Sequence, residues 1–317
     1  MKNLFTRIDT SKGKIGMYAM VAFTALVSLI AITARAQENA APTIGTIVTA
    51  IGSGGDDIGT DPLILTEATT TPIYVHGTAT DADGFGDIDA ANQYTMKTYR
   101  TPVGSGCTAS GRDCYANTGG TGVTLTNCGA GTTCDFEITV GVQYYADATA
   151  PGAFAYADDD WTASVTVADD SSAIGSSSDT FEIATLTALN VTASVDYLTL
   201  ALDAYSAQKT ITVTDTGNEI IDYLISAPDM SCDQGTIVTG NTHYSLNSNF
   251  GTTDPGPPYA DGTVMTDTPA AVNASVAVAS DGGGNTVPLY TILHIPEDGV
   301  KGACSNNITF TATTNGG

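Results

Sequence analysis

Beyond residue 36, apolar and polar side chains alternate along nearly every segment that has an ordered pattern. The clearest segment, CDFEITVGVQYY, places five apolar or aromatic residues on one face: Phe136, Ile138, Val140, Val142 and Tyr144. The segment DWTASVTVAD repeats the pattern, with Trp161 on its apolar face. Side chains of a strand point alternately to its two faces, so this period predicts half-buried antiparallel strands. No later stretch keeps a helical period, and the sequence therefore predicts an all-β fold.

Further strands are expected between clusters of Gly, Asp, Asn and Ser, which are typical of turns. In the first half they cover 44–51, 73–80, 94–99, 122–126 and 180–186, and in the second half 191–200, 209–214, 219–226, 271–279, 287–295 and 307–313. Short strands at this spacing predict β-sandwiches. We expect one over residues 37–186 and another over 187–317. The stretch 247–269, with four prolines, is expected to be a surface excursion.

Residues 1–36 have the order of an export signal. Basic residues precede the apolar run Ile15–Thr33, and Ala34-Arg35-Ala36 follows it. This arrangement predicts a signal peptide that is cleaved after Ala36. A run of this length also fits an uncleaved N-terminal membrane anchor. A third reading, a pilin leader cut after Gly13, would place Tyr18 where a glutamate is expected.

The formal net charge of −24 is strongly acidic. Removing a leader with net charge +4 leaves −28 on the mature chain, whose only basic residues are then Lys97, Arg100, Arg112, Lys209 and Lys301. A chain of this charge repels phosphate backbones, so nucleic acid is not expected as a partner. The 42% hydrophobic content and the regular strand patterns argue for packed domains rather than disorder.

Six cysteines in an exported chain favour disulfides over free thiols. Two pairs bracket short polar loops: Cys107 with Cys114, and Cys128 with Cys134. Cys232 and Cys304 are the remaining pair, and we expect them to close a long loop. Six cysteines nevertheless allow about 15 pairings, which spacing alone does not decide between.

Two groups of segments resemble known extracellular modules. VHGTATDADGFGDI with DDDWTASVTVADD resembles bacterial immunoglobulin-like and cadherin-like domains, and KTITVTDTGNEIIDYLIS with LHIPEDGVKGACSNNITFTAT resembles a second kind of immunoglobulin-like surface domain. The mature chain as a whole is similar to uncharacterised secreted proteins of the candidate phyla radiation (Patescibacteria). The resemblance implies two tandem immunoglobulin-like β-sandwich domains at the cell surface, behind an N-terminal signal or anchor helix, and it implies no enzyme activity.

The most chemically suggestive segment is GTATDADGFGDIDA, which carries Asp81, Asp83, Asp87 and Asp89. Carboxylates are the hard oxygen ligands that calcium prefers, although the EF-hand spacing is not met. The simpler interpretation is a turn in which the carboxylates cap backbone amides. If the strand order follows the resemblance, the aspartates at 158–160 and 169–170 are expected to reach the same end of the sandwich.

No catalytic constellation is expected. The three histidines, His76, His243 and His294, lie in separate segments, and the nucleophile, zinc and phosphate-loop motifs are missing from the sequence. Trp161 is expected to anchor the first core. Tyr145 is expected either to pack against a loop or to be exposed on a ligand surface.

These features predict a non-enzymatic, secreted structural protein of the cell surface, a coat or S-layer-like component that associates with itself or with other envelope proteins. The alternative is an adhesin or ligand-binding module whose loops, including Cys107–Cys134, contact a glycan or a host cell. Calcium is the only cofactor considered, and membrane contact is expected only through residues 15–33 if they are uncleaved.

Overall fold

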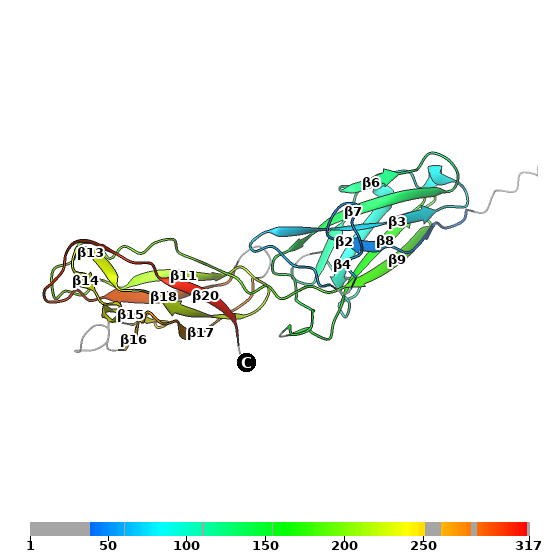
Figure 1. The fold of residues 1–317 in the computed structure, drawn as a ribbon. Helices are drawn as coiled ribbons and strands as arrows, with labels where there is room; N and C mark the ends of the chain where they lie inside the picture. Colours follow the sequence, from blue (N-terminus) through cyan, green and yellow to red (C-terminus); the bar gives the residue numbers. More distant parts are fainter. Residues whose placement is uncertain are drawn as a thin grey trace, which may run out of the picture. The chain divides into compact units, whose positions relative to one another are not determined.

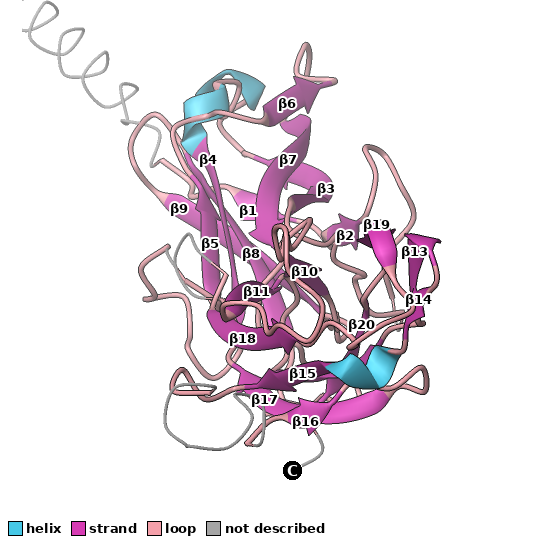
Figure 2. Ribbon diagram, turned by 90° about the vertical axis from the view of Figure 1, so that its left-hand side faces the viewer, coloured by secondary structure: helices cyan, strands magenta, loops and turns pink. Residues whose placement is uncertain are grey.

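The regular structure of the chain consists of strands. The computed structural model describes residues 39–59, 61–109, 111–153, 155–250, 261–279 and 284–315. Within these ranges there is no α-helix, only the 3₁₀ turns η1 (Phe85–Asp87), η2 (Ala91–Gln93) and η3 (Thr239–Asn241) (Figure 2). The same ranges contain no helix long and apolar enough to cross a membrane. The all-β prediction is confirmed, whereas the predicted leader lies outside the described residues.

Two antiparallel sheets are built from the first half of the chain (Figure 1). The five-stranded sheet has the order β1 (Thr43–Ile44), β3 (Thr70–Thr80), β7 (Thr133–Gln143) and β6 (Val123–Thr126), with β2 (Val48–Ala50) also paired to β3. The four-stranded sheet has the order β5 (Cys114–Asn117), β4 (Tyr94–Arg100), β8 (Trp161–Ala168) and β9 (Ile174–Phe181).

The apolar faces of these two sheets form one core. Every second residue of β7 is buried from Cys134 to Val142, as the alternation predicts. These side chains form a cluster with Trp161 and other residues of the four-stranded sheet. The ring centroids of Tyr94 and Phe136, one from each sheet, lie 5.4 Å apart. Each large apolar side chain buried in such a core stabilises the fold by about 1.5–3 kcal/mol, so the contact between the sheets favours sandwich-like packing.

The second half contains three antiparallel sheets. A five-stranded sheet has the order β10 (Leu189–Val191), β11 (Lys209–Asp215), β18 (Thr286–Leu293), β15 (Thr242–Ser245) and β16 (Thr263–Val264). A three-stranded sheet has the order β17 (Ala270–Val276), β12 (Ile221–Ser226) and β20 (Thr309–Thr314). The third sheet joins β14 (Thr236–Ile237), β13 (Met230–Gln234) and β19 (Lys301–Ser305). Buried residues of β11, β12 and β18, among them Ile211, Tyr223 and Leu289, form a second core.

Three strand predictions were wrong in their bounds, and the first of them, 44–51, is divided into the two short strands β1 and β2. Of the expected strand 191–200, only Val191 lies in a strand, β10, and Leu198 has a positive φ of 66°. The alternation in TASVDYLTL therefore does not form a paired strand. The expected strand 180–186 overlaps only the end of β9, which begins at Ile174. The serine-rich start of β9 has no apolar alternation, and it is held by pairing with β8 along its full length.

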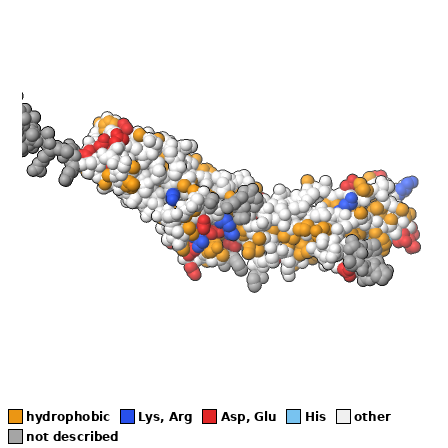
Figure 3. All heavy atoms as spheres, turned by 180° about the vertical axis from the view of Figure 1, so that it is seen from behind, with side chains coloured by type: hydrophobic (Ala, Val, Ile, Leu, Met, Phe, Trp, Pro, Cys, Tyr) orange, Lys and Arg blue, Asp and Glu red, His pale blue; other side chains and the backbone are white. Residues whose placement is uncertain are grey.

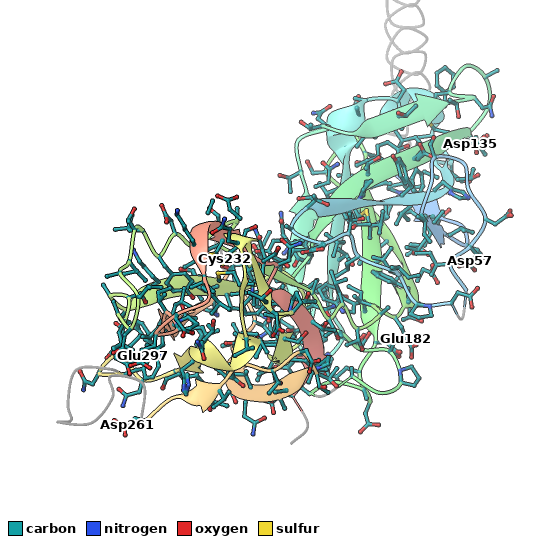
Figure 4. All side chains as sticks on the ribbon, turned by 60° about the vertical axis from the view of Figure 1, so that its left-hand side comes forward. Asp57, Asp135, Glu182, Cys232, Asp261 and Glu297 are labelled. Carbon is teal, nitrogen blue, oxygen red and sulfur yellow. A yellow bond between two sulfur atoms is a disulfide. The ribbon has the colours of Figure 1, made fainter. Side chains whose placement is uncertain are left out.

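Three disulfides cross-link the chain, and their pairing is the one that the spacing favours. Cys107 bonds to Cys114, Cys128 to Cys134 and Cys232 to Cys304. The last two residues lie directly opposite each other on β13 and β19, and Cys232 is labelled in Figure 4. No free cysteine is found among the described residues. Disulfides persist in oxidising compartments, so the three bonds indicate an oxidising environment of the kind met by extracellular β proteins.

Candidate metal centre

The aspartate-rich turn begins where β3 ends. The backbone amide of Asp81 donates to the carbonyl of Thr132, 2.8 Å away, which fixes the start of the turn beside β7. Oδ1 of Asp81 accepts from the amide of Asp83 at 2.8 Å. This contact is the Asx-type cap that the simpler interpretation predicts. Gly84 follows with a φ of 128°, which side-chain-bearing residues rarely adopt, so a glycine is required for the chain to turn here.

The turn gathers three carboxylates. Ligand oxygens of Asp81, Asp83 and Asp87 all lie within 4.8 Å of one another. Asp81 is fully buried, and its second oxygen, Oδ2, has no hydrogen-bond partner. A buried carboxylate oxygen without a hydrogen-bond donor is costly, and a bound cation would offset that cost. The cluster of three aspartates could bind a metal ion.

Asp135, labelled in Figure 4, shows how a carboxylate of the same sheet is satisfied without a cation. Its two oxygens accept from the side chains of Thr78 and Asn127, each at 2.6 Å. These two hydrogen bonds, the one from Asn127 first, lower the pKa of Asp135. Asp81 has no such donor on Oδ2. Asp135 therefore has hydrogen-bond donors for both carboxylate oxygens, whereas Asp81, at the centre of the cluster, has a donor for only one.

Electrostatic repulsion acts on the cluster from two sides. Partial loss of hydration raises the pKa of Asp87, and the carboxylates of its neighbours Asp81, Asp170, Asp83 and Asp169 raise it further. Since like charges disfavour each other's ionised form, a bound cation would reduce the repulsion between these carboxylates.

Asp169 and Asp170 reach the cluster from the end of β8. Gln93 links the two loops, because its Nε2 donates to the carbonyl of Asp87 and to Oδ1 of Asp170, the latter at 2.9 Å. This part of the expectation from strand order is correct.

The structure places two sets of the predicted aspartates away from the cluster: Asp89 and the aspartates at 158–160. Asp89 is exposed and lies outside the group of three. The aspartates at 158–160 precede β8, whereas Asp169 and Asp170 follow it, so the two sets lie at opposite ends of an eight-residue strand. Asp159 instead forms an ion pair with Arg100 at 2.5 Å. Strand direction decides this outcome, because a strand cannot bring both of its ends to one site.

The sequence analysis missed a group of ion pairs around Asp147. This buried carboxylate lies 3.2 Å from Nε of Arg100 and 2.9 Å from Nη2 of Arg112. The guanidinium of Arg100 also lies 3.8 Å above the ring of Tyr156. Only five Lys and Arg residues follow residue 36, and two of them meet here. The scarcity of basic residues was the only feature of the sequence that could have indicated these ion pairs. The contacts indicate that the group fixes loops rather than binds a ligand.

The histidines and Tyr145 are placed as follows. His76 lies on β3 and His243 on β15, while the ring of His294 stacks on Tyr205 and lies 3.3 Å from Asp203. Tyr145 is only 7% exposed. The buried alternative is therefore correct, and an exposed ligand-binding tyrosine at this position was wrong.

Asp215 is a further buried acid, at the end of β11. Oδ1 accepts from the amide of Gly217 at 2.6 Å, and Oδ2 has no partner. Burial raises its pKa from 3.8 to about 7, against lowering effects of the Gly217 amide and Arg112, with a smaller raising effect of Glu219.

The raised pKa of Asp215 makes the stability of the fold depend on pH. The unfolded chain releases the Asp215 proton near pH 4 and the folded chain near pH 7, so this residue's contribution to stability is lost as the pH rises through that window. We expect Asp215→Asn to become progressively more stable than the wild type from pH 4 to 7, by up to about 4 kcal/mol at about 1.4 kcal/mol per pKa unit. Urea unfolding at several pH values measures the difference. Asp56→Asn, at an exposed position, is the control, and parallel profiles for Asp215→Asn and the wild type would contradict the prediction.

Comparison of the sequence with known proteins does not assign the chain to a family. A scan against protein-family models finds no match, and a search of the curated proteins finds none either. The family resemblance described above therefore stays a prediction.

Proposed function

We propose that the chain is a non-enzymatic structural protein of the cell surface, a coat or S-layer-like component stabilised by calcium. It is built from two tandem immunoglobulin-like modules, residues 37–186 and 187–317. The observation that carries the proposal is the carboxylate cluster with the buried, unpartnered Oδ2 of Asp81. The three disulfides and the antiparallel sheets support an extracellular scaffold.

Calcium is the cation proposed because every candidate ligand is a carboxylate oxygen. Calcium takes six to eight oxygens at flexible geometry, and extracellular modules bind it at about 10⁻⁴–10⁻³ M. Asp81, Asp83 and Asp87 supply the first oxygens, and Asp170 lies next to them. Figure 3 shows one face, on which acidic side chains form a few separate groups, some with basic side chains beside them. Cations that screen this charge would let copies of the chain approach each other.

Calcium is expected to stabilise the wild type through Asp81. In calcium at about 1 mM, about ten times a Kd of about 10⁻⁴ M, linkage adds about 1.4 kcal/mol to the free energy of unfolding. Asp81→Asn keeps Oδ1 for the amide of Asp83 but removes the charge, so calcium should no longer stabilise that variant. In chelator Asp81→Asn should be more stable than the wild type, because removing one negative charge relieves repulsion within the cluster. Thermal melts in millimolar calcium and in chelator measure both effects.

Asp89→Asn is the matched control for this experiment. It removes one aspartate from the same segment, but outside the group of three. This variant should gain as much stability from calcium as the wild type does. Equal melting temperatures for the wild type in calcium and in chelator would show that no calcium site stabilises the fold.

Electron microscopy of the producing cell's envelope, with this protein labelled, tests the surface role. A periodic layer is the expected result. A protein that is released freely into the medium contradicts the proposal, and sparse label together with binding on a glycan array would favour the adhesin instead.

A further inference from the structure

Strand β20 has one unpaired edge. Within the described residues it pairs only with β12, and no strand is hydrogen-bonded to its other edge. An unpaired edge presents a row of amide and carbonyl groups that can pair with another chain. Natural proteins usually protect such edges with charges, prolines, bulges or short strands. The six residues of β20, TFTATT, carry no charge and no proline.

The other long edge strands of the described residues are protected. The pairing of β17 with β12 contains a register shift, and Ser275 on β17 has a positive φ of 45°. Strand β9 carries Asp179, whose Oδ2 accepts from the amide of Thr49 at 3.0 Å on β2, so this edge is partly covered. The edge strands β1, β5, β6, β10, β14 and β16 have two to four residues, and the edge strand β19 carries Lys301 and a register shift in its pairing with β13. Strand β20 is therefore the exception.

A groove with both apolar and polar lining residues lies beside the unprotected edge. It has a volume of about 1540 Å³, and its walls are residues 191–202 on one side and β19 with the start of β20 on the other. Leu198 and Leu202 line it and are 72% and 51% exposed. Ile308 and Phe310 are only half-buried, although they pack against the second core. The core is thus incompletely covered on this side, which favours an occupant with apolar side chains.

The charge of the groove indicates which occupant fits. Asp196 and Lys301 are its only charged lining residues, and the segment Asn306–Asn315 has none. The chain carries 34 acidic against 10 basic residues, so two copies repel each other over most of their surface. A neutral edge beside a groove with one acidic and one basic lining residue is a place where a second copy can dock with few opposing carboxylates.

We propose that a second copy of this chain docks at this edge, with the two β20 strands pairing antiparallel about a twofold axis. Ile225 and Tyr223 of the core pair with Phe310 and Ala312, so these two residues face inward. Opposed residues of an antiparallel pair share a face, so the axis passes through a residue position, and we place it at Thr311, near the middle of β20. The large Phe310 of one copy then lies opposite the small Ala312 of the other, and the inward side chains cover the groove. Such β-augmentation obtains its affinity from main-chain hydrogen bonds.

The inference rests on the proposed self-association of the chain, and it names the surface. Sedimentation of the full purified protein over a concentration series tests it, with the wild type expected to form a dimer. Thr311→Lys should weaken the dimer at least tenfold, because it places two lysines opposite each other at the axis. The substitution lowers the net negative charge, so a loss of affinity cannot come from general repulsion. Leu198→Ser should also weaken the dimer, by removing an exposed apolar wall of the groove.

Two control variants match these changes. Thr212→Lys adds the same charge at an exposed position of β11, which is an interior strand of its sheet. Val264→Ser removes an exposed apolar side chain, 44% exposed, from β16 outside the groove. Both should dimerise like the wild type. Hydrogen exchange should show slower amides at Thr309–Thr314 in the dimer than in the diluted monomer.

The outcomes separate this inference from the proposed function. A dimer that Thr311→Lys and Leu198→Ser leave intact overturns edge pairing but leaves the surface role standing. A dimer that is lost in chelator, and that Thr311→Lys and Leu198→Ser leave intact in calcium, shows cation-bridged association and overturns edge pairing, because β20 offers no carboxylate. A monomer at all concentrations, or a foreign polypeptide that protects Thr309–Thr314, overturns the second copy as occupant. The envelope microscopy decides the surface role independently.

Discussion

Replacing both Cys232 and Cys304 by alanine is expected to lower the free energy of unfolding by about 4 kcal/mol in the chain-entropy model. The two cysteines are separated by 72 residues, and the bridge closes this long loop in the unfolded chain. It also joins β13 to β19, which pair across the same position. Without it, the unfolded chain gains many conformations while the folded chain loses only one covalent link. Urea unfolding followed by far-UV circular dichroism measures the loss.

The double replacement of Cys107 and Cys114 is the control for this prediction. It also removes two sulfurs, but from a loop with a separation of only seven residues. The same model gives about 2 kcal/mol for this bridge, because loop entropy grows with the logarithm of length. The order of the two losses is therefore the measured quantity. Equal losses, or a larger loss for Cys107 and Cys114, would show that loop closure is not what the long bridge contributes.

Local alternation was enough to predict the strands whose two faces differ in burial. On β7 the sequence identifies the buried positions from Phe136 to Val142 because one face meets the core. It fails on β9, since GSSSD has no apolar alternation and only pairing with β8 makes it a strand. It also fails at residues 192–200, where the alternation is present but the segment lines an open groove. Pairing partners and coverage are long-range properties, and a local pattern does not contain them.

The candidate site shows the same division. The spacing of Asp81, Asp83 and Asp87 within one turn is local, and the sequence could predict that they gather. The loss of Asp89 from the group could not be predicted, because it depends on how η1 turns the chain after Asp87. The buried state of Asp81, which makes Oδ2 the centre of the site, depends on the contact with Thr132 from a segment about fifty residues away. Burial of this kind is visible only in the folded chain.

Trp161→Ala is expected to lower the free energy of unfolding by about 3–5 kcal/mol, the range for large aromatic side chains removed from a core. Trp161 is fully buried, and its ring stacks on Tyr115 at a centroid distance of 5.8 Å. Nε1 donates to the carbonyl of Asp147 at 2.9 Å, so the change also leaves that acceptor without its donor. The same residue Asp147 holds Arg100 and Arg112 through its carboxylate. The loss should therefore extend to the ion pairs that fix the neighbouring loops.

Two further variants separate packing from the hydrogen bond. Trp161→Phe keeps an aromatic ring beside Tyr115 but removes the donor, and we expect a loss smaller than that of alanine. Ile174→Ala is the exposed control, since this side chain on β9 is 64% exposed and its removal should change stability by less than about 0.5 kcal/mol. Circular dichroism must follow all three, because Trp161 is the only tryptophan and its fluorescence disappears with it. If Trp161→Ala costs no more than Ile174→Ala, Trp161 does not anchor the first core.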